Sequence, residues 1–162
     1  MFNLKMSEIN SIISEFLEEA YDGPKNLSTW FINNEPNSGL LGTISTINSD
    51  EASTPILKNG TTVAAHVEHL RWSLNMINSQ IKGENPQWLW SESWSIRNVN
   101  PDEWTKLVEN LRNEYSQLIQ TLSAGRVWIS GESLKEILAL IPHAAYHLGA
   151  IRQIVLVIKN KM

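Results

Sequence analysis

The chain contains 162 residues, of which 42% are hydrophobic, and carries a formal net charge of −4 at pH 7. These values fit one domain with a well-buried core over residues 1–162 and leave too little chain for two ordinary domains. The acidic balance and the lack of any run of Lys or Arg argue against nucleic acid as a partner, because phosphate binding needs a clustered basic face. The chain has no cysteine, which excludes disulfides, thiolate-ligated zinc and a cysteine nucleophile and fits a cytoplasmic location.

The first predicted element is a helix over about 7–21, because apolar residues repeat there at helical spacing. Its end is marked by the sequence Asp22-Gly23-Pro24, in which a glycine is followed by a proline that cannot continue the helix. Residues 1–16 lack the contiguous apolar stretch and the small-residue cleavage site of a signal peptide, so we interpret them as the start of this helix. A short connector helix is predicted over 38–47, between segments with turn-forming composition.

Two further long helices are predicted in the middle of the chain. The first covers about 61–83 and has a continuous apolar stripe at helical spacing. The second has a capping box at its start, with Asn100 as the N-cap, Pro101 as the first helical residue and Glu103 as the third. Gly125 is expected to end it.

The connector between these two helices is rich in tryptophan. It contains Trp88, Trp90 and Trp94, and Trp104 follows shortly after it. Large aromatic side chains in a connector mostly pack it onto the neighbouring helices, and we expect this role here. The alternative is that these side chains wall a pocket.

A fourth long helix is predicted over about 133–159, with Ser133 and Glu136 as its capping box. It is apolar on most sides, so we expect it to be the most buried helix. Polar residues such as Arg152 interrupt its apolar run. One arginine at the centre of a bilayer costs roughly 2.5–3.5 kcal/mol on insertion scales, so we expect a buried helix and no membrane span.

Pro142 lies inside this fourth pattern, where a proline removes one hydrogen bond and leaves the carbonyl of Leu138 without its donor. Either the proline opens the helix packing beside His143, or it begins a new helix after a short break. No useful β alternation occurs in the chain. Four long amphipathic helices with these connectors predict an all-α protein, an antiparallel four-helix bundle with a short extra helix and a Trp-rich connector.

All four histidines lie in two clusters on the predicted helices. His143 and His147 are spaced i and i+4, which places both rings on one helix face as two nitrogen ligands of one divalent ion. His66 or His69 can supply a third nitrogen, and helical geometry alone favours His66, which lies nearer the centre of its apolar stripe. A single histidine on an apolar helix is more often a core residue, but four histidines in two such clusters favour a metal site with an open position.

The segments TVAAHVEHL and PHAAYHLGAIRQ resemble the DinB-like (damage-inducible DinB/YfiT) superfamily of metal-dependent enzymes, and the resemblance extends over essentially the whole chain. It implies a four-helix bundle in which His69, His143 and His147 bind Zn²⁺, Ni²⁺ or a similar divalent metal ion. His66 is then a substitute ligand or a residue that supports the ligands. The resemblance also implies a homodimer as the expected assembly.

Relatives in this superfamily include thiol S-transferases that use bacillithiol or mycothiol. The resemblance therefore implies a metal-dependent transferase that adds a low-molecular-weight thiol to a small electrophile. Because the chain has no cysteine, the thiol must come from a cosubstrate. Alternatives are a metal-dependent hydrolase and a non-catalytic metal-binding bundle of a stress response. An iron oxygenase with two histidines and one carboxylate would need Glu68, the only acid beside the histidines on that helix.

Three further side chains have more than one interpretation. Arg71 and Arg152 can anchor a carboxylate of a thiol cosubstrate, or each can form an ordinary ion pair with an acid of the protein. Tyr146 can be a general acid near the metal, a dimer contact or a residue at the pocket rim.

Overall fold

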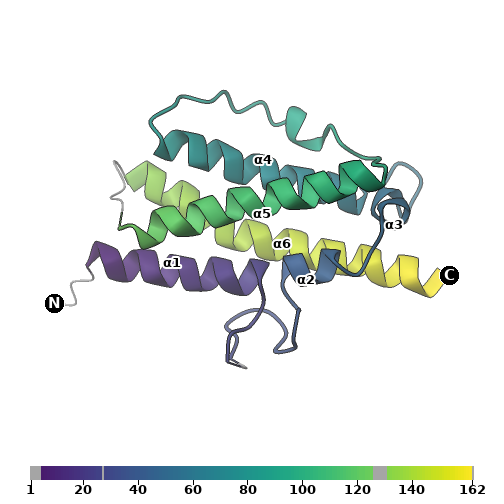
Figure 1. The fold of residues 1–162 in the computed structure, drawn as a ribbon, viewed down its shortest axis with the longest axis horizontal. Coiled ribbons are helices and arrows are strands. Elements are labelled where there is room, and N and C mark those ends of the chain that lie inside the picture. The colour runs from purple at the N-terminus through teal and green to yellow at the C-terminus, as the bar shows by residue number, and fades with distance from the viewer. Residues whose placement is uncertain (1–4, 27, 126–130, 162) are drawn as a thin grey trace.

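The computed structural model describes residues 5–26, 28–125 and 131–161. These ranges contain helices and no strand. The elements are α1 (Met6–Tyr21), α2 (Leu40–Ile44), α3 (Ser49–Ser53), α4 (Val63–Ile81), the short 3₁₀ helix η1 (Glu92–Trp94), α5 (Pro101–Ser123) and α6 (Gly131–Lys161). The four long helices form a bundle in which α4 packs on α5 and α6, and α1 packs on the same two helices from the other side (Figure 1). The predicted helical bundle is therefore confirmed.

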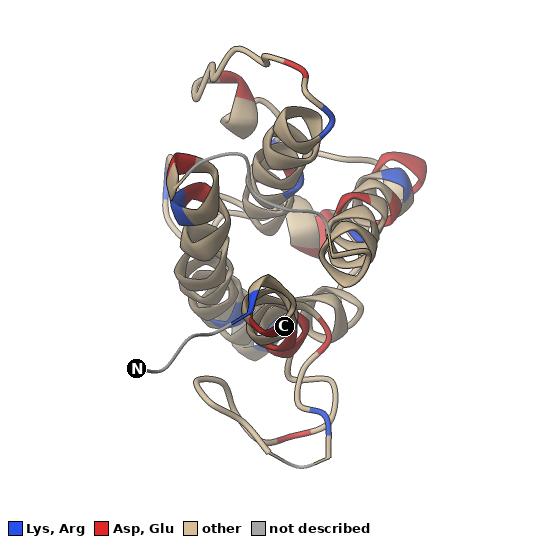
Figure 2. Ribbon diagram, turned by 90° about the vertical axis from the view of Figure 1, so that its left-hand side faces the viewer, with Lys and Arg blue, Asp and Glu red and all other residues tan. Residues whose placement is uncertain are grey.

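The helix directions differ from the uniform antiparallel arrangement predicted from sequence. In Figure 1, α4 and α5 run in the same direction, and so do α1 and α6. The pairs α1–α5 and α4–α6 are antiparallel. The reason is the connector 82–100, which returns along the length of α4 before α5 begins. Seen from the end of the bundle, this connector lies outside α4, and basic and acidic residues are scattered over several helices (Figure 2).

Local sequence signals account for most of the helix boundaries. Gly23, directly after the end of α1, has a φ of +99°, a conformation that glycine adopts without strain. At the start of α5, the Glu103 amide donates to Asn100 Oδ1 over 2.9 Å and the Asn100 amide donates to Glu103 Oε2 over 2.8 Å. This confirms the predicted capping box.

The predicted connector helix over 38–47 corresponds to the shorter α2, and a second short helix, α3, follows beyond the predicted end. The second was not expected, because the residues after 47 were interpreted as turns. Asn48 caps α3 through a reciprocal pair of hydrogen bonds with Glu51. The sequence signal was present, since an Asn followed three residues later by a Glu is a capping box.

The start of α6 also corrects a prediction. The chain is already helical at Gly131, so Ser133 lies inside the helix and does not cap it. The helix continues without a break through Pro142, which excludes a new helix beginning at that proline. Pro142 and Leu138 are both exposed, so the Leu138 carbonyl that lacks an amide donor faces water and not the core. Solvation thus offsets part of the cost of the proline.

The most buried helix is α4, whereas the sequence predicted that α6 would be the most buried. Every residue from Val63 to Leu70 is buried, because α5, α6, α3 and η1 all pack around this part of α4. On α6, by contrast, Leu138, Tyr146 and Leu156 are exposed. By length and composition alone, α6 is the one helix among the described residues that is long and apolar enough to cross a membrane.

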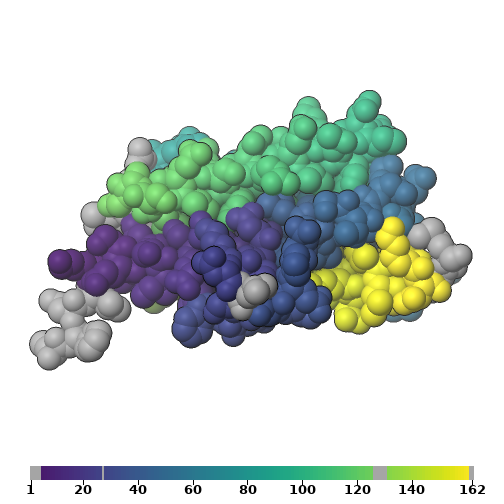
Figure 3. All heavy atoms as spheres, turned by 60° about the horizontal axis from the view of Figure 1, so that its bottom comes forward, coloured from purple at the N-terminus to yellow at the C-terminus, as the bar shows by residue number. Residues whose placement is uncertain are grey.

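The segment between α1 and α2 lies across the face formed by α1 and the C-terminal part of α6 (Figure 3). The buried Glu19 carboxylate holds this segment by accepting the backbone amides of Trp30, Phe31 and Ile32 at 2.8–3.0 Å. Arg152 of α6 donates to the side-chain oxygen Oδ1 of Asn33 over 2.9 Å and to the backbone carbonyl of Ser38. Two charged side chains therefore fix a segment that has no regular structure of its own.

Replacing Glu19 with Ala should remove the buried carboxylate that three backbone amides share as acceptor and lower the free energy of unfolding by about 3 kcal/mol. The backbone amides of Trp30, Phe31 and Ile32 should also exchange faster with deuterium. The matched control is Glu18→Ala, because Glu18 forms a largely solvated ion pair with Lys25. We expect that control to cost less than about 1 kcal/mol in urea unfolding, and equal losses in the two variants would contradict the role of Glu19.

Candidate metal centre

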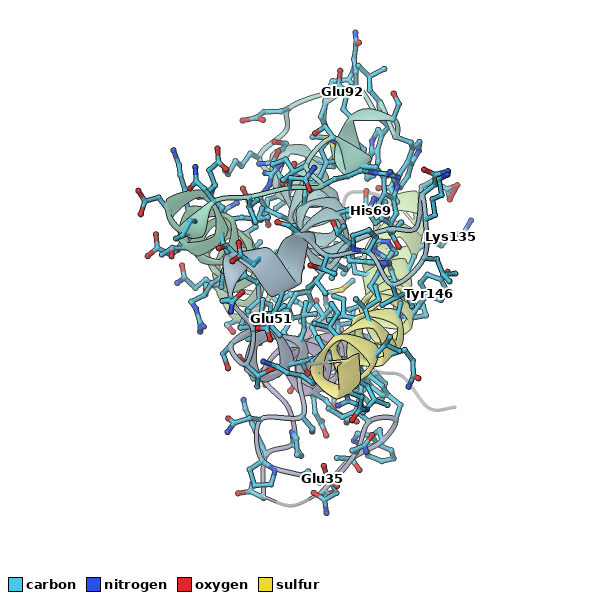
Figure 4. The ribbon with its side chains drawn as sticks, turned by 90° about the vertical axis from the view of Figure 1, so that its right-hand side faces the viewer. Glu35, Glu51, His69, Glu92, Lys135 and Tyr146 are labelled. Atoms are coloured by element: carbon cyan, nitrogen blue, oxygen red, sulfur yellow. The ribbon has the colours of Figure 1, made fainter. Side chains whose placement is uncertain are left out.

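The four histidines meet between the N-terminal half of α4 and the middle of α6. Because these helices are antiparallel, His66 at the start of α4 lies beside His147, and His69 one turn later lies beside His143. His66, His69 and His147 are at most 6% exposed, and His143 is half-buried. Figure 4 shows His69 between the two helices and below the connector. The two clusters predicted to share one site are thus brought together.

Three imidazoles direct the same nitrogen at one point. The Nε2 atom of His143 lies 3.0 Å from Nε2 of His69 and 3.0 Å from Nε2 of His147. The candidate ligand atoms of these three residues all lie within 4.8 Å of one another. Nitrogens bound tetrahedrally to one zinc ion at 2.0–2.1 Å are separated by about 3.3 Å. The geometry of the triad is therefore that of a site able to hold one divalent ion.

Hydrogen bonds on its other nitrogen orient His69 for this role. The Ser93 hydroxyl is fully buried and donates to the Trp90 carbonyl over 2.7 Å. Its oxygen therefore accepts from Nδ1–H of His69, which lies 2.7 Å away. This bond keeps the ring proton on Nδ1 and leaves the Nε2 lone pair directed at the other two histidines. Carbonyl or hydroxyl partners of this kind are typical behind metal-binding histidines.

His66 occupies a comparable position behind His147. The Nδ1 atoms of the two rings are 2.8 Å apart, and Nε2 of His66 lies 3.0 Å from the Thr61 hydroxyl. If Nε2 of His147 faces the centre without a proton, its Nδ1–H donates to Nδ1 of His66, and His66 then donates from Nε2 to Thr61. Both nitrogens of His66 thus have partners outside the triad. His66 as a fourth metal ligand stays a prediction.

Burial makes these histidines suited to bind a cation as neutral bases. Desolvation lowers the pKa of His66 and of His69 to about 4, and the nearby imidazoles add to the shift at His69. The pKa of His147 falls to about 3 for the same reasons, and burial also lowers the pKa of His143. Near neutral pH no proton therefore competes with a metal ion for the three Nε2 atoms.

Tryptophans of the connector cover the histidine cluster. The Trp94 ring stacks on His69 with centroids 4.2 Å apart and meets His66 edge-on at 5.4 Å. Trp90 lies 6.0 Å from His69. Trp104, in contrast, is buried in the bundle and donates from its indole nitrogen to the Ile47 carbonyl. Trp104 thus has the packing role predicted for the tryptophans, whereas Trp94 and Trp90 contact the site.

A cavity of about 500 Å³ adjoins the triad at His143. It lies between α4 and α6 under the connector, and its lining consists of Ser73, Ile77, Trp88, Trp90, Glu136, Ala139, Leu140 and His143. The lining is mostly apolar, which is usual for a site that binds a small organic molecule. A molecule in this cavity would touch a ring of the triad.

Of the other residues singled out from the sequence, Glu68, Arg71 and Arg152 lie away from the triad, whereas Tyr146 adjoins it. Glu68 accepts two hydrogen bonds from Arg71, at 2.7 and 2.8 Å, which confirms the ion-pair interpretation for this arginine. The pair lines a different cavity, between α4 and α5, so Glu68 does not supply the carboxylate of an iron oxygenase site. Arg152 binds the segment between α1 and α2. Tyr146 is 71% exposed on the outer side of α6, with its ring edge-on to His147 at 5.0 Å (Figure 4).

Two participants were missed by sequence reasoning. Ser93 and Thr61 are small polar residues in connectors, and nothing in their local pattern distinguishes them from ordinary turn residues. Only the folded arrangement shows that each is the partner of a histidine.

Comparison with protein-family models, with curated proteins and with solved structures finds no match, so the DinB-like resemblance rests on the histidine motifs and the helix order alone. Fold and site together define an all-α helical protein with a buried three-histidine cluster suited to a divalent metal ion.

Substitution of the histidines should separate ligands from supporting residues. His69→Ala and His147→Ala should abolish binding of one equivalent of zinc, as measured by elemental analysis of untagged protein and by titration calorimetry. His66→Ala and Ser93→Ala should keep the stoichiometry and weaken the affinity by about 10–100-fold, because they remove only the groups that orient the ligands. Loss of the whole equivalent in His66→Ala would instead make His66 a ligand.

The metal-free protein should lose stability as the pH falls from 7 to 5. An unfolded histidine takes up a proton near pH 6.5, whereas the folded pKa of His66 and of His69 is about 4. Between these values the unfolded state binds more protons, so acid favours unfolding. Urea midpoints measured at pH 7, 6 and 5 check this, and the interval from pH 7.5 to 8.5 serves as the control in which no histidine titrates. A constant urea midpoint from pH 7 to 5 would contradict the conclusion that the histidines are buried in their neutral form.

Proposed function

We propose that the protein is a metal-dependent enzyme that acts on a small organic substrate at the His69, His143 and His147 triad. The observation that carries this proposal is the position of His143, whose ring belongs to the triad and also lines the adjoining cavity. A substrate in the cavity would lie directly beside the ion held by the three Nε2 atoms.

An open coordination position favours catalysis over a purely structural role. Structural zinc sites are usually closed by four protein ligands, whereas catalytic sites have three and keep one position for substrate or water. His66 is the obvious fourth ligand, but its two nitrogens face His147 and Thr61. The fourth position is thus left to a small molecule, which argues against a non-catalytic metal-binding bundle.

The reaction we propose is transfer of a low-molecular-weight thiol to a small electrophile. An ion bound by three neutral imidazoles retains its full positive charge and lowers the pKa of a thiol that binds to it. A free thiol has a pKa near 8.5, so this charge alone is enough to ionise it at neutral pH without a protein base. The same charge would also ionise bound water near pH 7, so a metal-dependent hydrolase is the second reaction that the triad allows.

The side chains of the protein would have separate tasks in this transfer. Ser93 and His66 hold two of the ligand rings in place through their second nitrogens. Trp94 covers one side of the cluster and excludes water there. The sulfur forms the new bond to the electrophilic carbon in the cavity, the thiol proton passes to solvent, and the leaving group departs with its electron pair.

Incubation of the zinc-loaded protein with a thiol such as bacillithiol or cysteine and a chromogenic aryl halide tests this function. We expect thiol consumption above the uncatalysed rate, and we expect it to be abolished in His147→Ala together with the bound metal. Glu132→Gln is the control, because Glu132 is an exposed residue of α6 that pairs with Lys135 away from the triad. Full turnover in His147→Ala, or no turnover with any thiol in zinc-loaded wild type, would contradict the proposal.

A further inference from the structure

The cavity beside the triad is elongated along α6. Glu136, Leu140 and His143 repeat at i, i+4 and i+7, so they lie on one face of the helix, and all three line the cavity. Seven residues of α-helix span about 10.5 Å. The cavity therefore has one end at the triad and another end, two helical turns away, at a carboxylate.

The wall opposite α6 is built from indole rings. Trp88 and Trp90 line the cavity, with ring centroids 5.5 Å apart. Both pack against Trp72 of α4, which is only 6% exposed, with centroids at 5.6 and 5.1 Å. Trp72 thus fixes the two outer rings from behind. The wall presents aromatic faces and edges in a defined position.

Among the described residues that line the cavity, Glu136 is the one acid, and no described basic side chain pairs with it. The adjacent Lys135 is paired with Glu132 over 2.8 Å. No lysine or arginine of the residues that the structure describes forms an ion pair with Glu136. The hydroxyl of Ser73, which also lines the cavity, donates to the His69 carbonyl over 2.8 Å. The charge that the cavity offers a ligand is therefore negative and located at its far end.

We propose that the cavity binds substrates with an apolar body and a cationic amine or quaternary ammonium group, with the cation at Glu136 and the reactive end at His143. The inference deepens the proposed function by naming its substrate class, and it rests on that function only for the role of the reactive end. An ammonium group beside a carboxylate and indole rings gains both charge pairing and cation–π attraction. An anionic ligand would be repelled, and a neutral one would desolvate the carboxylate without pairing it.

The size of the cavity agrees with such a ligand. A volume of about 500 Å³ is within the range of sites for small organic molecules and accommodates an aryl ring with a short alkyl chain. The two-turn distance between Glu136 and His143 requires the cation and the reactive group to be at opposite ends of the molecule.

Three probes of the same length and different charge test the inference: 4-phenylbutylammonium, 4-phenylbutanol and 4-phenylbutyrate. Titration calorimetry on the wild-type protein should give a dissociation constant about tenfold lower for the ammonium than for the alcohol, and the metal-free protein should show no measurable binding of the carboxylate. The titrations are made with metal-free and with zinc-loaded protein. The preference for the cation should appear in both, so it can fail or hold independently of metal binding and turnover.

Glu136→Gln keeps the shape of the side chain and removes its charge, and it should make the ammonium and the alcohol bind equally. The matched control is Glu132→Gln, one turn earlier on α6, where the exposed glutamate pairs with Lys135 and does not line the cavity. That variant should keep the preference. Trp90→Leu, with its fold checked by circular dichroism, should weaken binding of the ammonium more than binding of the alcohol.

Equal affinity of the ammonium and the alcohol in wild type would overturn the inference, as would a tenfold preference that persists in Glu136→Gln. Absence of binding for all three probes would overturn it as well, because the cavity would then not accept an apolar body of this length. A preserved cation preference without any thiol transfer would uphold the binding site and contradict only the proposed reaction.

Discussion

The structure depends on the burial of imidazole rings between α4 and α6. A buried ring nitrogen without a partner costs free energy, so each nitrogen must be satisfied by the protein or by a ligand. Ser93 satisfies one nitrogen of His69, and His66 together with Thr61 satisfies one nitrogen of His147. The Nε2 atoms of His69 and His147 each lie 3.0 Å from Nε2 of His143, which offers at most one proton to these two lone pairs. A bound cation resolves this conflict, since each lone pair then has an acceptor of electrons.

The direction of the helices turns this local constraint into a site. Because α4 and α5 run parallel, the chain between them must travel back along the bundle, and it does so directly over the histidines. The connector carries Ser93, which orients one ligand, and Trp94, which covers the cluster. A tight turn between α4 and an antiparallel α5 would have left the histidines open to water. The long connector is therefore part of the site and explains why tryptophans are concentrated in it.

Sequence patterns predicted the long helices and the two histidine pairs, because both depend on spacing within one element. The capping box at Asn100 and the i, i+4 pair His143 and His147 are examples. The helix directions could not be predicted from the sequence, because amphipathic periodicity is the same whichever way a helix runs. For the histidines of α4, the angle to the apolar stripe favoured His66 as the inward residue, and only the resemblance of the histidine motifs named His69 as a ligand. This angle takes no account of the connector, which covers a second side of α4, so that both His66 and His69 are buried.

The same limitation applies to Glu136, which was interpreted as a helix-capping residue beside Ser133. Since α6 begins earlier than its capping pattern indicated, this carboxylate is not used at a helix end and lines the cavity instead. Its distance from the triad follows from helical geometry once the start of α6 is known, because Glu136, His143 and His147 share one face of a single rigid element. A binding group and two candidate ligands on one helix keep their separation whatever the connector does.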